Sequence, residues 1–381
     1  MNSDKKRTIY LYIGMGKTGS SSVHQFLIDN KKTLLEKQVL FPEVENKEHI
    51  WVPMDYINFE LLIHQFRVDE IDISEFTTRF NSQFVSQLDR TTCNNMILLS
   101  DEMFNLKDKM DFLDVFFELG FEVKVIVYIR RPSEYLASAW GEELKPNTPI
   151  AKRITLEESF DNREICFSTV FSFIEKLGKE NVIVRPFEKE QWKNNDLIED
   201  WLSCIGVELT NEFVSAGWQN PSFSRNTSEI FLLVNRMLLP LDEIQQLKKR
   251  IVELSEDDYP SITDTLSDRF IDMVTEHYRP MYERLAETYG YDHFFVNEYP
   301  NCYRKHENRK EFKEIVLSSK QLTILYEAME RQKKYNRYIF NQDGSMIDVN
   351  KENFTNNHET LSRSESTNKG ILHNIFKLKK S

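Results

Sequence analysis

The stretch Thr8–Leu27, TIYLYIGMGKTGSSSVHQFL, decides the fold expected for this chain. Its first residues, Thr8–Ile13, are apolar and rich in β-formers, which predicts a buried strand. Three glycines, Lys17 and three serines follow, and then apolar residues recur at helical spacing. A strand, a glycine turn and a helix N-terminus gather backbone N–H groups, the helix dipole and a lysine around one spot. The stretch therefore predicts a site for a phosphate-type anion.

Three further apolar runs predict strands, at Asn95–Ser100, Glu122–Ile129 and Asn181–Arg185. Helix-like segments separate them, and this alternation favours an α/β fold with a parallel sheet covered by helices on both faces. The strands end in the polar sequences GMGKTG, DE, RRP and PFE. Because ligands of such sheets bind beyond the carboxyl ends of the strands, we expect the functional site there.

The C-terminal part of the chain is expected to be mostly helical. Apolar spacing predicts helices over Asn195–Leu202, Thr227–Leu238, Leu241–Leu254, Asp264–Thr288 (kinked at Pro280) and residues 311–334. After Asn341 the composition turns polar. We therefore expect a main domain over residues 1–300, a helical extension over 301–340 and a polar, disordered tail over 341–381.

Charge and composition limit the classes of partner. The 381 residues include 61 acidic and 49 basic ones, a formal charge of −12, which argues against general nucleic-acid binding. An anionic ligand must then be held by a local cluster of donors. The four cysteines (Cys93, Cys166, Cys204 and Cys302) are scattered, which suggests neither a zinc site nor a disulfide framework. No run is long enough for a membrane helix, so we expect a cytoplasmic protein.

The sequence GKT invites comparison with the Walker A motif of nucleotide kinases. With the lysine at Lys17, that motif needs a glycine at position 11, and the chain has Leu11 there. The run ILLSDE (Ile97–Glu102) resembles a Walker B strand. An ATP-dependent kinase that uses Lys17 and Asp101 therefore stays open as an alternative.

The loop fits another pattern in register, G-x-x-K-[ST]-G-[ST]-[ST]-[ST]. This pattern resembles the phosphosulfate loop of sulfotransferases that use 3′-phosphoadenosine-5′-phosphosulfate (PAPS). The resemblance covers residues 8–290 and implies a three-layer, P-loop-like sandwich with no required metal. It implies that Lys17 stabilises the leaving group while the loop binds the cofactor. The matching loop residues are Gly14, Lys17, Thr18, Gly19, Ser20, Ser21 and Ser22.

A second motif of the same family is an Arg-x-Pro at a strand end, with a serine eight residues after the arginine. Here Arg130, Pro132 and Ser138 stand at those positions. The resemblance implies that Arg130 and Ser138 hold the 3′-phosphate of the cofactor. Arg131 carries no such signal and is expected to be a surface charge.

Two later segments also resemble the family. In Asn181–Leu209 a strand ends in an aromatic–Glu pair, and Phe187 is expected near the adenine. In Pro221–Asn235, either Arg225 or Asn226 is expected to close over the 3′-phosphate. The alternative for this segment is an ordinary helix N-cap at Asn226 or Thr227.

Transfer to a hydroxyl also needs a general base. Glu102 is preferred over Asp101, because MILLSDEMF resembles the family's strand that ends in Ser-x-Glu. His49 is the alternative base, with Trp51 and Tyr56 near it to stack on a sugar. His24, on the helix after the loop, is expected to be a packing or surface residue.

The sequence thus predicts a sulfotransferase that moves a sulfuryl group from PAPS to a hydroxyl and releases PAP. A carbohydrate or glycolipid acceptor is expected from the resemblance to bacterial carbohydrate-type members alone. A catalytically inactive binding relative is the third alternative. Neither the acceptor nor the oligomeric state follows from the sequence.

Overall fold

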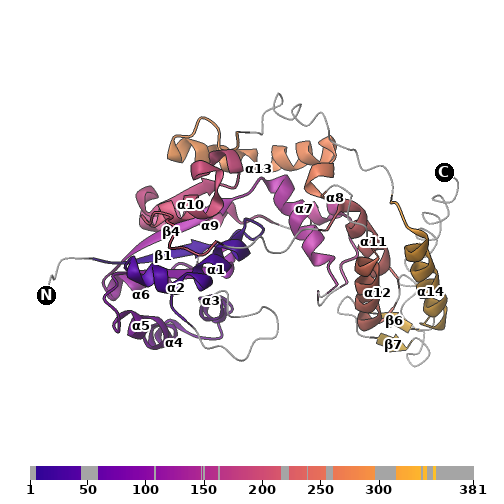
Figure 1. The fold of residues 1–381 in the computed structure, drawn as a ribbon, viewed down its shortest axis with the longest axis horizontal. Helices are drawn as coiled ribbons and strands as arrows, with labels where there is room; N and C mark the ends of the chain where they lie inside the picture. The colour runs from indigo at the N-terminus through magenta and orange to yellow at the C-terminus, as the bar shows by residue number, and fades with distance from the viewer. Residues whose placement is uncertain are drawn as a thin grey trace. The chain divides into compact units, whose positions relative to one another are not determined.

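The computed structural model describes residues 6–43, 59–106, 109–146, 148, 151–161, 164–215, 223–237, 239–254, 261–296, 315–335, 338–340 and 346–348. The described chain forms two compact units (Figure 1). The first comprises Met1–Tyr135, Ile165–Asn220 and Glu276–Tyr303, and the second comprises Leu136–Glu164, Pro221–Thr275 and Arg304–Ser381. The division into 1–300, 301–340 and 341–381 stays a prediction, and residues 349–381 lie outside the described residues.

The first unit is built on a five-stranded parallel sheet in the order β2-β3-β1-β4-β5. The strands are β1 (Arg7–Ile13), β2 (Val39–Leu40), β3 (Asn95–Ser100), β4 (Phe121–Ile129) and β5 (Val182–Pro186). The α/β fold with a central parallel sheet is confirmed. All four strands predicted from apolar runs are present, and β2 was not predicted.

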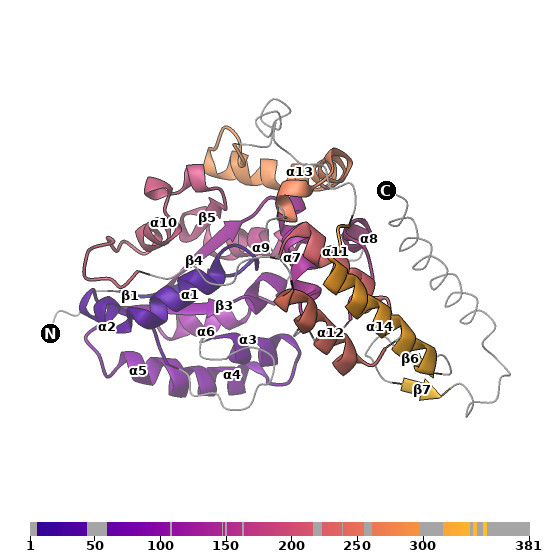
Figure 2. The same cartoon turned by 45° about the vertical axis from the view of Figure 1, so that its right-hand side comes forward.

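The central strand β1 is buried on both faces, since every residue from Thr8 to Ile13 is less than a tenth exposed. Helices therefore cover both sides of the sheet (Figures 1 and 2). The helices of this unit are α1 (Ser20–Asp29), α2 (Lys31–Glu36), α3 (Glu60–Arg67), α4 (Ile73–Phe80), α5 (Ser86–Leu88), α6 (Phe112–Glu118), α9 (Phe167–Leu177) and α10 (Leu197–Cys204). Single turns η2 (Glu102–Asn105), η3 (Lys179–Asn181), η4 (Lys189–Gln191) and η5 (Lys193–Asn195) and the π-helix η1 (Asn81–Val85) join them.

Aromatic rings fill both faces of the sheet. On one face Tyr12 packs edge-on against Tyr128 and Trp201, under α1 and α10. A second cluster surrounds Phe59, which contacts phenylalanines of α4, η1 and α6. These two clusters fix the sheet, and with it the loops at the carboxyl ends of the strands.

Apart from one pair of short antiparallel strands, the elements described in the second unit are helical. It contains α8 (Leu156–Asp161), α11 (Arg225–Asn235), α12 (Leu241–Glu253), η6 (Thr263–Thr265), α14 (Ser319–Tyr335) and the antiparallel pair β6 (Tyr338–Phe340) and β7 (Met346–Asp348). Helices α7 (Pro132–Glu143) and α13 (Asp268–Tyr289) cross the division between the units. Pro280 lies inside α13, and the kink expected there stays a prediction.

The last helix begins at Ser319, later than the predicted residue 311. Gln321 N donates to Ser318 Oγ (3.2 Å) while Ser318 N donates to Gln321 Oε1 (3.0 Å). This reciprocal pair is a capping box, which ends the extended segment and starts the helix.

Candidate functional site

The loop from Gly14 to Gly19 leaves β1 in the middle of the sheet and returns into α1. Three of its residues have left-handed backbone, Gly16 (φ 71°), Lys17 (φ 53°) and Gly19 (φ 72°). Gly14 N donates to Ser100 O of the neighbouring strand at 3.2 Å, which fixes the point where the loop begins. Turns that contain left-handed residues can direct neighbouring N–H groups to one side, as in an anion-binding nest.

Two of the loop glycines are required by close packing. A Cβ on Gly14 would overlap the carboxylate of Asp101, which follows β3. A Cβ on Gly19 would lie 2.5 Å from Leu197 Cδ2 and 3.3 Å from the ring of Phe187. The loop is therefore wedged between the ends of β3 and β5 and the start of α10.

The N-terminus of α1 faces the same loop. Gly19 is its N-cap and offers no side chain, while Ser22 N and Val23 N bond back to Gly19 O at 3.0 and 3.1 Å. The first turn holds Ser20 to Ser22 and no acidic residue. The positive end of the helix dipole is thus not neutralised within the helix, which favours an anion.

Thr18 is fully buried, and its hydroxyl makes no hydrogen bond of normal geometry among the described residues. It lies near the hydroxyl of Tyr12, which is also buried without such a bond. Burial and the charge of Asp101 raise the pKa of Tyr12, and the Thr18 hydroxyl opposes that rise. The side chain of Thr18 therefore contributes to the core beneath the loop.

Arg130, from the predicted Arg-x-Pro motif, lies at the end of β4 and contacts the loop that follows β1. Its Nη1 donates to the carbonyl oxygen of Lys17 at 2.9 Å, and its Nε donates to Glu134 at 3.3 Å. The guanidinium carbon lies 5.6 Å from the ring centre of Phe187. Its Nη2 makes no hydrogen bond to any described residue.

Arg131 is not the surface charge that was expected. Its side chain is 13% exposed and forms ion pairs with Glu188 (2.6 Å) and Glu134 (3.0 Å). Glu188 is almost fully buried and also accepts from Gln191 Nε2 and Val296 N. Arg131 therefore holds the ends of β4 and β5 together behind Arg130.

Ser138 and Arg225 belong to the second unit, so their predicted place beside the 3′-phosphate stays a prediction. Ser138 lies on α7 and is half-buried. The Arg225 guanidinium pairs with Glu229 at 2.5 Å and lies 5.1 Å from the ring centre of Trp140. Within this unit Arg225 is held by neighbours on its own helix and on α7.

Asn226 has a structural role within the second unit. Its amide donates to Val316 O (2.9 Å) and accepts from Val316 N (2.8 Å), which uses both ends of the amide. The N-cap of α11 is Ser224, whose hydroxyl accepts from Thr227 N at 3.2 Å. The expected N-cap at Asn226 or Thr227 is therefore wrong by two or three positions.

The side chains of both predicted bases lie outside the described part of the structure. Glu102 begins η2, and Asp101 is the one residue between it and the end of β3. His49, Trp51 and Tyr56 lie outside the described residues. His24 is 3% exposed and packs edge-on against Tyr12, and burial lowers its pKa to about 4, so it is a neutral packing residue.

Sequence reasoning missed one carboxylate at this end of the sheet. Glu60 begins α3 and accepts a hydrogen bond from Ser100 Oγ at the end of β3. Phe59 N donates to Leu99 O at 3.1 Å, which fixes the start of α3 against β3. Nothing in the sequence near Glu60 signals this contact, because only the packing of Phe59 brings the two elements together.

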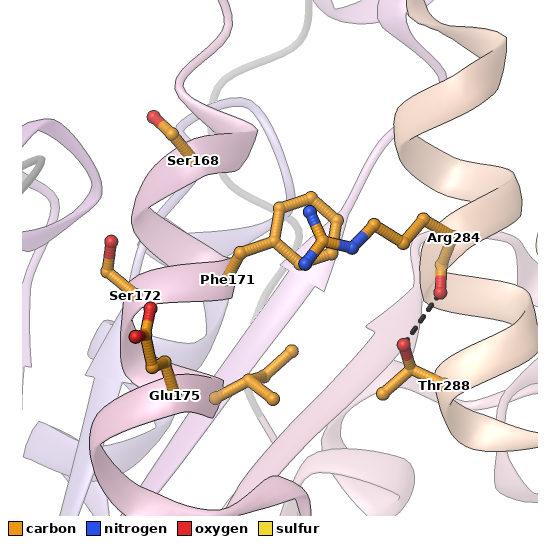
Figure 3. Close-up of a pocket in the computed structure, with 7 residues that line it drawn as sticks. Ser168, Phe171, Ser172, Glu175, Arg284 and Thr288 are labelled. Atoms are coloured by element: carbon orange, nitrogen blue, oxygen red, sulfur yellow. Dashed lines mark hydrogen bonds between the residues drawn. The ribbon is translucent and has the colours of Figure 1, made fainter.

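A separate groove of about 580 Å³ lies between α9 and α13 (Figure 3). The guanidinium of Arg284 lies 4.1 Å from the ring centre of Phe171, and Glu175 lines the same groove. One charge of each sign gives no net attraction for a bisphosphate. None of the predicted site residues lines this groove.

Among the described residues, no group of three or more His, Cys, Asp or Glu side chains is placed to hold a metal ion. Cys93, Cys166 and Cys204 are free thiols, and Cys302 lies outside that part of the chain. A search of the described helices finds none that is both long and apolar enough to span a membrane.

No family model matches the chain, and no curated protein matches it. Its structure is similar to that of a sulfotransferase from Alicyclobacillus acidocaldarius (13% identity over 76% of this chain and 98% of that chain, TM-score 0.40). It is similar to mouse sulfotransferase SULT7A1 complexed with PAP (10% identity, 74% and 86% of the chains, TM-score 0.35). It is also similar to retinol dehydratase in complex with androsterone and inactive cofactor PAP (11% identity, 87% and 82%, TM-score 0.25). The solved structures that the chain resembles thus include sulfotransferases.

Proposed function

We propose that the protein is a sulfotransferase that transfers a sulfuryl group from PAPS to a hydroxyl. The observation that carries the proposal is the hydrogen bond from Arg130 Nη1 to Lys17 O. It brings together two anion-binding motifs that are far apart in the sequence. A ligand with anionic groups at both ends, such as PAPS, matches a site with two separate cationic side chains.

The residues present fit such a ligand. The unneutralised N-terminus of α1 and the left-handed loop provide N–H donors for the 5′-phosphosulfate. The Nη2 of Arg130 is proposed to provide donors for the 3′-phosphate. Ser138 and Arg225 are proposed to donate further hydrogen bonds to the 3′-phosphate. Phe187, which packs against both Arg130 and Gly19, is proposed to contact the adenine.

PAPS, when bound, supplies the sulfuryl group and leaves as PAP. The ammonium group of Lys17 is proposed to stabilise the charge that develops on the leaving oxygen. Glu102 is proposed to take the proton of the acceptor hydroxyl, with His49 as the alternative base. The acceptor oxygen then forms the new bond to sulfur while the bond from sulfur to the phosphate oxygen breaks.

The acceptor is proposed to be a carbohydrate or a glycolipid. This part rests on the resemblance of the sequence to bacterial carbohydrate-type members alone. Incubation with ³⁵S-labelled PAPS and a panel of glycans and glycolipids tests it. Label in a phenol or an amine but in no sugar would reject this acceptor class.

An ATP-dependent kinase is the second candidate. It is favoured by one observation, the packing of the Asp101 carboxylate against Gly14 at the head of the loop. Titration with PAP in EDTA and with ATP–Mg²⁺ separates the two candidates. Tight binding of PAP without metal supports sulfuryl transfer, whereas binding of ATP that depends on Mg²⁺ supports the kinase. A protein that binds PAP and labels no acceptor would be the inactive relative.

A further inference from the structure

Two of the three guanidinium nitrogens of Arg130 are hydrogen-bonded within the protein. Its Nη1 bonds to Lys17 O at 2.9 Å, its Nε to Glu134 at 3.3 Å, and its face lies over Phe187. The side chain is 17% exposed, so these contacts hold it in one orientation. The Nη2 group bonds to no described residue and is the nitrogen proposed to bind a ligand.

The carbonyl that Arg130 contacts belongs to Lys17, a loop residue with a side chain and a left-handed backbone. Lys17 has a side chain and still adopts φ 53°, next to Gly16 at φ 71°. A left-handed conformation is unfavourable for a residue with a Cβ and persists only where neighbours stabilise it. The charge-assisted bond from Arg130 to the Lys17 carbonyl is such a stabilising contact.

We propose that Arg130 holds the loop from Gly14 to Gly19 in its binding conformation and also binds the 3′-phosphate. This inference rests on the proposed function. The guanidinium has five N–H donors in a fixed plane, so it can hold the Lys17 carbonyl and a phosphate at the same time. One side chain then couples the two ends of the cofactor site, and each phosphate binds better when the other is present.

Nucleotides that carry only one of the two phosphates test the coupling. Calorimetric titrations would use PAP, 5′-AMP and 3′-AMP with the wild-type protein, Arg130→Ala and Arg130→Lys. If Arg130 also shapes the loop, Arg130→Ala weakens 5′-AMP about fivefold, the factor expected for one lost hydrogen bond. Arg130→Lys weakens 5′-AMP similarly but retains more affinity for 3′-AMP, because it keeps the charge without the fork of donors.

Arg7→Ala is the matched control, since it removes the same charge from an exposed pair with Asp89. Unchanged 5′-AMP affinity in Arg130→Ala, together with weakened PAP, would overturn the inference and leave the proposed function intact. A wild-type protein that binds no PAP would instead reject the proposed function.

A second measurement needs no ligand. Amide hydrogen exchange of the peptide containing residues 14–22 is expected to be faster in Arg130→Ala than in the wild type and in Arg7→Ala. Equal exchange in all three proteins would overturn the positioning role. Melting curves of the variants confirm that each is folded before either comparison.

Discussion

Arg130 Nη1 and the carbonyl oxygen of Lys17 are 2.9 Å apart, so a hydrogen bond connects the end of β4 to the loop after β1. These two strands are neighbours in the sheet. The parallel sheet sets the carboxyl ends of the two strands side by side, and this brings the two short motifs together.

Lys17→Ala is expected to lower sulfuryl transfer at least about 10²-fold, because it removes the charge proposed to stabilise the leaving oxygen. PAP affinity and the melting temperature should change much less. Initial rates with ³⁵S-labelled PAPS measure the effect. Lys37→Ala, which opens an exposed pair with Glu212, is the control. Full activity in Lys17→Ala would reject the assignment of this lysine.

Gly19→Ala is expected to destabilise the protein by about 1–3 kcal/mol and to weaken PAP binding. Gly19 has φ 72°, and its new Cβ would contact Leu197 and Phe187. Gly206→Ala is the matched control, because Gly206 also has φ 72° but no atom within 4 Å of a Cβ. Urea unfolding of both variants separates backbone strain from the clash. Equal losses would show that the contact with Leu197 has no cost.

The general base is expected to be identified by its pH–rate profile. Glu102→Gln should lower kcat about 10²-fold and remove the acidic limb of the profile, while PAP affinity is unchanged. His49→Ala and Glu60→Gln, measured in parallel, are expected to have smaller effects. A larger effect of either one would transfer the role to that residue.

His24 is expected to make the protein sensitive to acid. Burial lowers its pKa to about 4 in the folded state, so between pH 6.5 and 4 the unfolded chain binds the proton more readily. Stability is lost as the pH falls through this window, by up to about 3 kcal/mol. Urea unfolding at pH 7.5 and 4.5 should show a smaller loss in His24→Phe. The exposed His277, changed to Gln, should leave the loss as in the wild type.

Lys248 is expected to lower stability near neutral pH. It is 1% exposed, its Nζ bonds only to Lys145 O at 3.3 Å among the described residues, and burial lowers its pKa to about 7. The unfolded chain binds this proton up to about pH 10.4, so stability rises with pH between 7 and 10.4.

Lys248→Met should therefore stabilise the protein by about 2–4 kcal/mol at pH 7 and by much less at pH 10. Urea unfolding at the two pH values measures the difference. Lys249→Met, on the exposed side of the same helix, is the control. A variant that is less stable than the wild type at pH 7 would contradict the prediction.

The sheet could be predicted from the sequence because its strands are continuous apolar runs. Asn95–Ser100 was placed with the bounds that the structure shows, whereas Val39–Leu40 is too short to give a periodic signal. The loop and Arg130 were predicted from their resemblance to two short family motifs, and their role in binding stays a prediction. The burial of Arg131 could not be predicted from the sequence, because its ion-pair partner Glu188 is 57 residues away. Glu60 was missed for the same reason: its contact with Ser100 depends on how α3 packs.

The two hydrogen bonds between the Asn226 side chain and the Val316 backbone connect α11 to a segment 90 residues later in the chain. Asn226 is 5% exposed, and both ends of its amide are bonded to the backbone of Val316. A chain that stopped at residue 300 would lose both hydrogen bonds of the Asn226 amide to Val316, each worth about 0.5–1.5 kcal/mol. Any shortened form of this protein that is meant to keep α11 intact should therefore retain the chain through Val316.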